Sequence, residues 1–252
     1  MKPSEQRQQF RLRKENGTTS GMCDNYLQAN MIILPKDYAF EFLLFCQRNP
    51  KSCPIVDVLE SGVVEPGVAG ADIRTDLPKY RIYRDGKFTE EVHDIQEEWR
   101  DDFVTFLIGC SFTFEKALLK EGIALLHQDQ NRVVPMYKTN ISCEKAGRFE
   151  GEMVVSMRAL KPNEIEKAVQ ITEQFQTSHG GPIHIGNPEE IGIYDIHQPD
   201  YGESISFDST ERTPVFWACG VTPQNVCVHA KPEIMISHAP GHMLITDQLE
   251  EK

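Results

Sequence analysis

Short segments typical of strands and of helices alternate along this 252-residue chain, and glycine or proline separates most of them. The apolar run 27–34, closed by a proline, can be a strand or another element that enters the core, whereas 163–175 has the apolar spacing of an amphipathic helix. Strands over 80–83 and 88–92 flank Asp85-Gly86, a pair that tolerates the positive φ angles of a hairpin turn. Interspersed strands and helices predict a mixed α/β fold, because both kinds of element must share a core.

The other expected elements are shorter or less regular. Asp37 is expected to cap the second helix, and Gly109-Cys110-Ser111 is expected at a helix–helix junction. The remaining expected helices cover 4–14, 37–47, 95–107 and 113–120 with a small one after Pro188, and the remaining strands cover 55–59, 153–157, 182–185, 215–218, 234–237 and 244–246.

The strand–helix–strand segment between about 132 and 201 has the length of a separate two-layer unit. We therefore expect a three-layer αβα-like main domain formed by 1–131 and 202–252. A smaller two-layer α/β subdomain, 132–201, is expected to be inserted into it.

Charge and cysteine usage exclude several classes of protein. The net charge of −12 argues against nucleic acid as a partner, because a phosphate-binding surface normally carries a basic excess. The polar N-terminus lacks the apolar region of a secretory signal, and the apolar stretches 39–46 and 103–110 are too short to span a bilayer. Seven scattered cysteines without a CxxC pair are typical of reduced thiols in a cytoplasmic protein, the location we expect.

Several blocks along the chain carry a family resemblance. They read QANMIILP at 28–35, DIRTDLP at 72–78, LIGCSFTFE at 107–115, VPMYKTN at 134–140, PVFWACGVTP at 214–223 and HAPGHMLITD at 238–247. In this order they resemble the hydro-lyase family to which D-glutamate cyclases belong, and in length the chain is similar to the bacterial single-unit members. The resemblance implies a carbon–oxygen lyase of amino-acid metabolism that removes water, with closure of D-glutamate to 5-oxo-D-proline as the implied reaction.

Closing glutamate into a lactam makes definite chemical demands. The α-carboxylate needs a cationic or N–H anchor, the amine must be neutral, and the γ-carboxyl must be protonated or polarised before hydroxide can leave. An arginine, a helix N-terminus and one or two histidines could meet these demands.

The candidate catalytic residues come from two blocks. His238 and His242 flank Pro240-Gly241, whose turn could direct both imidazoles into one cavity, although either ring could instead bond a backbone carbonyl. Ser111 and Cys110 precede a helix whose N–H groups could bind an oxyanion, although they could equally be a cap and a small core residue.

The candidate substrate-binding residues are more scattered. Arg74 lies in a loop from which it could grip a carboxylate, or pair internally with Asp72 or Asp76. Arg158 follows an apolar strand and could reach a cleft or form a structural ion pair. The other candidates are Asn30, Asn140, His184, Gly220 and Thr222. We expect Arg74, Ser111 and His242 to gather around one electropositive concave site.

Several alternatives remain at this point. The absence of GxGxxG and GxxxxGK[ST] motifs predicts that no redox or nucleotide cofactor is needed. No motif indicates a metal, although a divalent ion could assist. A hydro-lyase for another hydroxy acid or 5-oxoproline-pathway metabolite, or a non-catalytic module that binds a small carboxylate, would also fit. A small carboxylate is the expected ligand, with no nucleic acid or membrane partner, and a homodimer is possible.

Overall fold

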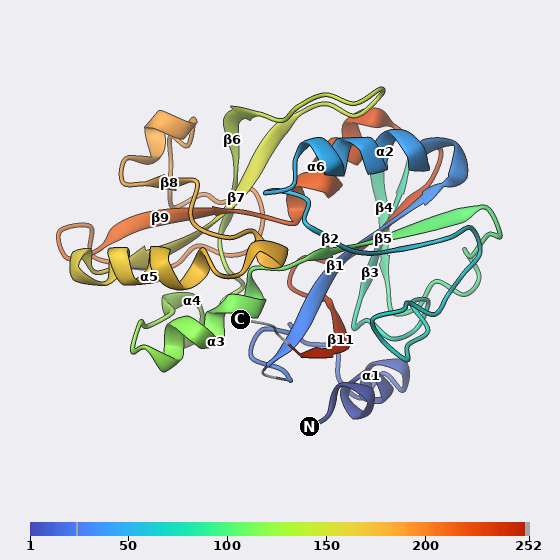
Figure 1. Cartoon of the computed structure of the whole chain (residues 1–252), viewed down its shortest axis with the longest axis horizontal. Coiled ribbons are helices and arrows are strands. Elements are labelled where there is room, and N and C mark those ends of the chain that lie inside the picture. Colours follow the sequence, from blue (N-terminus) through green and yellow to red (C-terminus); the bar gives the residue numbers. More distant parts are fainter. Residues whose placement is uncertain (24, 250–252) are drawn as a thin grey trace.

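The computed structural model describes residues 1–23 and 25–249 and contains two antiparallel sheets (Figure 1). The first sheet has seven strands in the order β2-β5-β1-β10-β3-β4, with β11 also paired to β1. The strands are β1 (Tyr26–Pro35), β2 (Ile55–Leu59), β3 (Tyr80–Arg84), β4 (Lys87–Val92), β5 (Phe103–Gly109), β10 (Met235–His238) and β11 (Leu244–Leu249). The mixed α/β class expected from the sequence is confirmed.

Strand β1 is the centre of the first sheet. One edge pairs with β5 along its length, while the other is shared by β11 near Ala29 and by β10 at Ile32 and Ile33. Between these two partners the ladder is interrupted, and the N–H of Met31 donates to Nδ1 of His238 at 3.1 Å. The imidazole thus replaces a missing strand partner at a position where an unpaired backbone group would be costly.

The two faces of this sheet are covered differently. Helices α2 (Lys36–Arg48) and α6 (Val221–Ala230) lie over one face, where Phe42, Phe45 and Val226 pack on Ile32 and Phe106 (Figure 1). The opposite face is covered mainly by the long connections before β3 and before β5. Helix α1 (Pro3–Arg11) lies beside β11.

The second sheet has four strands in the order β6-β7-β9-β8. Helices α3 (Phe112–Lys120) and α5 (Ile165–Thr172) pack against one another and bury Trp217 with Phe114 beneath this sheet. The strands are β6 (Met136–Ser142), β7 (Glu152–Leu160), β8 (His184–Ile185) and β9 (Thr213–Ala218), and the short helices are α4 (Leu126–Asp129), η1 (Pro162–Glu164), η2 (Gln176–Ser178) and η3 (Pro188–Ile191).

The division into a main domain and an inserted subdomain stays a prediction. The second sheet includes β9, which lies outside the expected insert 132–201, and α3 from the earlier segment packs on α5. The two sheets therefore share helices and strands across the expected boundaries.

Three local predictions were wrong. The expected helix 95–107 is a loop followed by β5, a strand buried on both faces, which therefore lacks the period of two that distinguishes a strand from a helix. Asp37 does not cap α2, because the helix already begins at Lys36 after Pro35. Gly109-Cys110-Ser111, expected between two helices, instead joins the end of β5 to α3.

Candidate functional site

The first part of the candidate site is the junction between β5 and α3. The chain leaves β5 at Gly109 and enters α3 through Cys110 and Ser111, so this is a strand-to-helix rather than the expected helix–helix junction. A side chain on Gly109 would overlap the carbonyl oxygen of Thr177, because the segment before His179 lies directly against it. Ser111 is the N-cap residue but its hydroxyl does not bond the helix N–H groups. It is free to contact a side chain from the second sheet.

The second part is the equivalent junction between β9 and α6. Cys219 and Gly220 join this strand to the helix, which has no side-chain cap. A Cβ on Gly220 would overlap the amide of Asn30, whose Nδ2 also donates to the Gly109 carbonyl at 2.8 Å. Asn30 therefore holds the two strand–helix junctions together.

Thr222 and Asn30 have structural contacts that the sequence did not indicate. The Thr222 hydroxyl accepts from the Val154 N–H at 3.0 Å and donates to the Val154 carbonyl at 3.1 Å, which fixes the first turn of α6 to β7. Both side chains are buried. Together they position the N-termini of α3 and α6, whose N–H groups favour negative charge.

Arg158, on β7, is the charged centre of the site and is only 2% exposed. Its Nη2 donates to Glu115 at 2.5 Å and to the Ser111 hydroxyl at 3.1 Å, while Nη1 donates to Ser156 at 2.9 Å. We call Arg158, Glu115, Ser111, Ser156 and His127 the Arg158 cluster. The guanidinium also lies over the aromatic rings of two core residues, Phe114 and Trp217, at 5.2 and 5.5 Å from their centroids.

Glu115 is the buried counter-ion of this arginine. Its other oxygen accepts from Gln128 at 2.7 Å, and Nε2 of His127 lies 3.2 Å from the carboxylate. Burial alone would raise the pKa of Glu115, but His127 and Arg158 outweigh it and lower that pKa to about 2. The carboxylate therefore stays ionised at neutral pH and neutralises part of the positive charge.

Cys110 and Cys219 lie in one apolar cluster at the two helix N-termini. Burial raises the pKa of Cys110 to about 12 and that of Cys219 to about 11. The N–H groups of Phe112 and Val221, together with Arg158, act in the opposite direction and favour the thiolates. The two thiols thus share the same electrostatic surroundings.

The close contact of Gly220 with Asn30 gives a stability prediction. Gly220→Ala should lower the free energy of unfolding by about 1–3 kcal/mol, because the added methyl group must displace the Asn30 amide. Urea unfolding would measure this. Gly67→Ala is the control: Gly67 is exposed and its Cβ would lie 3.5 Å from Asp57, so a loss as large as that of Gly220→Ala would contradict the argument.

The candidate histidines bond to backbone groups, which was the alternative stated for His238 and His242. His238 is 1% exposed and accepts from Met31, and burial lowers its pKa to about 4. His242 is half-buried, its Nδ1 donates to the Pro240 carbonyl at 2.8 Å, and burial lowers its pKa as well. His184 lies on β8 with Nε2 at 2.8 Å from the Asn187 carbonyl.

Arg74 and Asn140 have contacts outside the Arg158 cluster. Arg74 forms the internal salt bridge with Asp72, with Nη2 at 2.7 Å from the carboxylate. Asn140 is exposed on β6 and packs against Gly192. Arg74, Ser111 and His242 therefore do not gather around one site. Ser111 contacts a buried arginine, Arg158. Arg74 and His242 each bond a residue of their own loop.

Glu115, His127, Ser156 and Cys219 were not singled out from the sequence as functional residues. Ser156 and Arg158 are two residues apart on one strand and so project from the same face, which is a signal that could have been used. The spacing of Ser111 and Glu115 by one helical turn is another. No spacing in the sequence links His127 to Arg158 or to Glu115.

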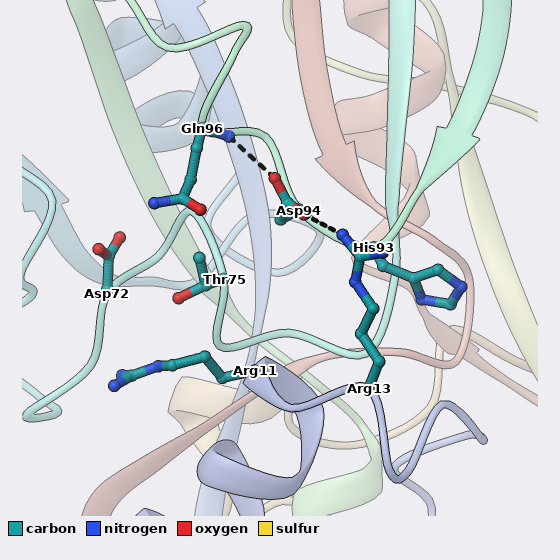
Figure 2. Close-up of a pocket in the computed structure, with 7 residues that line it drawn as sticks. All are labelled: Arg11, Arg13, Asp72, Thr75, His93, Asp94 and Gln96. Carbon is teal, nitrogen blue, oxygen red and sulfur yellow. Dashed lines mark hydrogen bonds and ion pairs between the residues drawn. The ribbon is translucent and has the colours of Figure 1, made fainter.

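A separate cavity of about 330 Å³ lies near α1 and is lined by charged side chains (Figure 2). Arg13 is paired with Asp94 at 2.7 Å, and Arg11 with Asp76 at 2.6 Å, so a ligand would have to compete with existing ion pairs. The lining residues are Arg11, Arg13, Asp72, Thr75, His93, Asp94 and Gln96. We therefore favour the two strand–helix junctions as the functional site.

Neither a metal cluster nor a membrane-spanning helix occurs within residues 1–23 and 25–249. In these ranges, no three side chains of His, Cys, Asp or Glu are grouped so that they could hold a metal ion. In the same ranges, none of the helices has the length and apolar character needed to cross a membrane.

The sequence comparisons with known proteins point to one family. A sequence model described as D-glutamate cyclase matches residues 104–247, which include both junctions and the Arg158 cluster. A protein of Oceanobacillus iheyensis named "Putative hydro-lyase" is 78% identical over 252 residues and covers 100% of both chains. Others with that name, from Bacillus subtilis and Geobacillus kaustophilus, are 57% and 56% identical over 100% of this chain and 98% and 96% of their own.

One solved structure also aligns with the chain. It is a nitrogen repressor-like protein from Methanococcus jannaschii, with a TM-score of 0.40 and 11% identity over 93% of this chain and 91% of that one, and so weak a likeness carries no argument. The family follows instead from the extent of the sequence matches. The chain belongs to the D-glutamate cyclase family.

Proposed function

We propose that the protein is a lyase that removes water from a small carboxylate, and that its substrate is D-glutamate, which it closes to 5-oxo-D-proline. The observation that carries the proposal is the meeting of two helix N-termini with the buried Arg158. Relatives at 56–78% identity carry the hydro-lyase name, which supports the reaction class. The family description supports the choice of substrate.

The proposed reaction joins the amine nitrogen to the γ-carbon and releases water. The helix N-termini would hold the α-carboxylate, since their N–H groups favour an anion. Arg158, already oriented by Glu115 and the Ser111 hydroxyl, would polarise the γ-carboxyl group. Because burial keeps the Cys110 thiol protonated at neutral pH, this thiol could give its proton to the hydroxide that leaves the protonated γ-carboxyl group as water. The resulting thiolate would take up the proton that the amine nitrogen loses when the amide forms, so the thiol is restored.

The direct test is incubation of the purified protein with D-glutamate, followed by mass spectrometry. We expect a product lighter by one water, with L-glutamate as the comparison substrate. D-glutamate that remains intact at high enzyme concentration would contradict the proposed substrate. Alkene formation from a panel of hydroxy acids would then identify a different hydro-lyase.

Ser111→Ala tests whether this site carries the reaction. Loss of a hydroxyl that orients Arg158 should reduce turnover about 10²-fold, as for the removal of one positioned hydrogen-bonding group in other active sites. Ser209→Ala is the matched control, because Ser209 is exposed in a loop. Equal activity of both variants and the unmodified protein would place the chemistry elsewhere.

A further inference from the structure

A small cavity of about 60 Å³ lies between the loop that precedes β1 and the first turns of α3. Its lining includes exposed residues, such as Gly21 and Asn25, and the buried side chains of Gln28 and Glu115. Glu115 is the counter-ion of the buried arginine in the Arg158 cluster. The cavity therefore reaches from the surface of the protein to that cluster.

Gln28 contributes a buried acceptor to this cavity. Its Nε2 donates to the Thr19 carbonyl at 2.9 Å and to the Met22 carbonyl at 3.2 Å, so both hydrogens of the amide nitrogen are used. The side chain is 4% exposed, and Oε1 has no hydrogen-bond partner in the part of the chain that the structure describes. A buried acceptor without a partner costs free energy, so Oε1 favours a ligand that donates a hydrogen bond.

The Glu115 carboxylate is a second acceptor in the cavity. Its Oε1 accepts from Arg158 at 2.5 Å, whereas its Oε2 accepts from Gln128 at 2.7 Å, and Gln128 also lines the cavity. Because the carboxylate is ionised at neutral pH, it favours a charged donor. Lys116 lines the cavity too, where it donates to the exposed Asn25 at 2.8 Å. An ammonium group would supply one donor to Gln28 and one to Glu115.

We propose that this cavity is the subsite for the α-amino group of the substrate, with Oε1 of Gln28 and the Glu115 carboxylate as its two acceptors. The inference rests on the proposed function and deepens it, because it assigns Gln28 to substrate binding and requires an amino acid rather than a hydroxy acid. An amino group is similar in size to a water molecule, which occupies about 30 Å³ in the liquid. It therefore fits a cavity of about 60 Å³.

The position of the cavity suits closure of the lactam. Phe112 and Thr113 line it, so an amine bound there would lie beside the helix N-terminus that we assign to the α-carboxylate. Arg158, which we assign to the γ-carboxyl group, contacts the same Glu115 carboxylate. Glu115 would thus bring the amine close to the γ-carboxyl group, as ring closure requires.

Two acceptors leave the third N–H bond of the ammonium group free. This bond would break as its proton moves to a γ-carboxylate oxygen of the same molecule, where an O–H bond forms. The electron pair of the N–H bond stays on the nitrogen as the lone pair that attacks the γ-carbon. The transfer gives the neutral amine and the protonated γ-carboxyl group that closure needs, and no other reactant takes part.

The experiment compares D-glutamate with glutarate, which has the same two carboxylates but no amine. Calorimetric titration of the full chain, in the cold where turnover is slow, would give both affinities. D-glutamate should bind at least about 10-fold more tightly, and D-2-hydroxyglutarate, with a single O–H donor, should lie between them. Equal affinity of the unmodified protein for D-glutamate and glutarate would overturn the subsite, and this outcome does not depend on the folding of any variant.

Gln28→Met tests the acceptor itself. The variant keeps the length of the side chain but loses Oε1, so it should reduce the affinity for D-glutamate and kcat/KM for closure about 10–100-fold. The affinity for glutarate should not change. An equal loss for both ligands would mean that Gln28 only supports the loop, and the assignment would be wrong.

Thr19→Val is the matched control. The Thr19 hydroxyl accepts from the Met243 N–H at 3.1 Å and so anchors the same loop, while the Thr19 carbonyl still accepts from Gln28. A loosened loop should weaken both ligands alike, so Thr19→Val should leave the ratio of the two affinities unchanged.

The same samples separate this inference from the proposed function. Closure of D-glutamate without a preference over glutarate would overturn the subsite alone, and the cavity would hold only water. A preference for D-glutamate that depends on Gln28, without any closure, would support the subsite and contradict the proposed reaction. Neither preference nor closure would overturn both.

Discussion

Glu115→Ala is expected to lower the free energy of unfolding by about 3–5 kcal/mol, because it leaves the buried charge of Arg158 without its counter-ion. The two side chains are 1% and 3% exposed, so water cannot replace the lost carboxylate without a rearrangement of the core. Arg158→Ala should have a similar effect, since it removes the guanidinium that pairs with the buried Glu115 carboxylate. Urea unfolding at pH 7 would measure both losses.

The control for this prediction is a surface ion pair of similar geometry. Arg132 lies 2.7 Å from Glu203, but the side chains are 52% and 41% exposed, so Arg132→Ala should change stability by at most about 1 kcal/mol. Replacing both buried partners, as Arg158→Met with Glu115→Leu, should cost less than either alanine variant, because no unpaired charge remains. A loss below about 1 kcal/mol for Glu115→Ala would mean that Arg158 finds another partner.

Where local chemistry decides the structure, the sequence was sufficient. Asp85-Gly86 adopts the positive φ angles of the expected hairpin turn, and the helical spacing after residue 163 corresponds to η1 and α5. β5 could not be predicted in the same way, because both of its faces are covered and its apolar run has no distinctive period. Its strand conformation depends on pairing with β1 and β2, which are distant in the sequence.

The candidate site was predictable only in pieces. The sequence singled out Ser111, Cys110 and Arg158 separately, but their association depends on how the second sheet meets α3, which no local pattern encodes. His238 shows the opposite case. It was chosen for its neighbouring turn, yet its bond to Met31 completes the interrupted ladder of β1. Such a role depends on strand order, and strand order has no local signature in the residues around His238.

The second large effect is a loss of stability in mild acid, caused by His179 and His238. Burial lowers the pKa of each to about 4, from 6.5 in an exposed histidine, so the unfolded chain takes up protons in this interval while the folded protein does not. Stability should therefore fall as the pH drops from about 6.5 to about 4, by roughly 3 kcal/mol for each residue. Glu115 causes a separate loss of stability at lower pH. This loss begins near the unfolded-state pKa of 4.5 and continues as the pH falls towards the folded-state pKa of about 2.

The histidine variants assign this acid transition. His238→Gln keeps an acceptor for the Met31 N–H, and His179→Asn suits the left-handed backbone at φ 78°, so both should fold. Each should flatten the plot of unfolding free energy against pH between 6.5 and 4, and the double variant should flatten it most. His197→Gln, at an exposed position, should leave the slope unchanged. If the double variant kept the full slope, the buried neutral histidines would not be its cause.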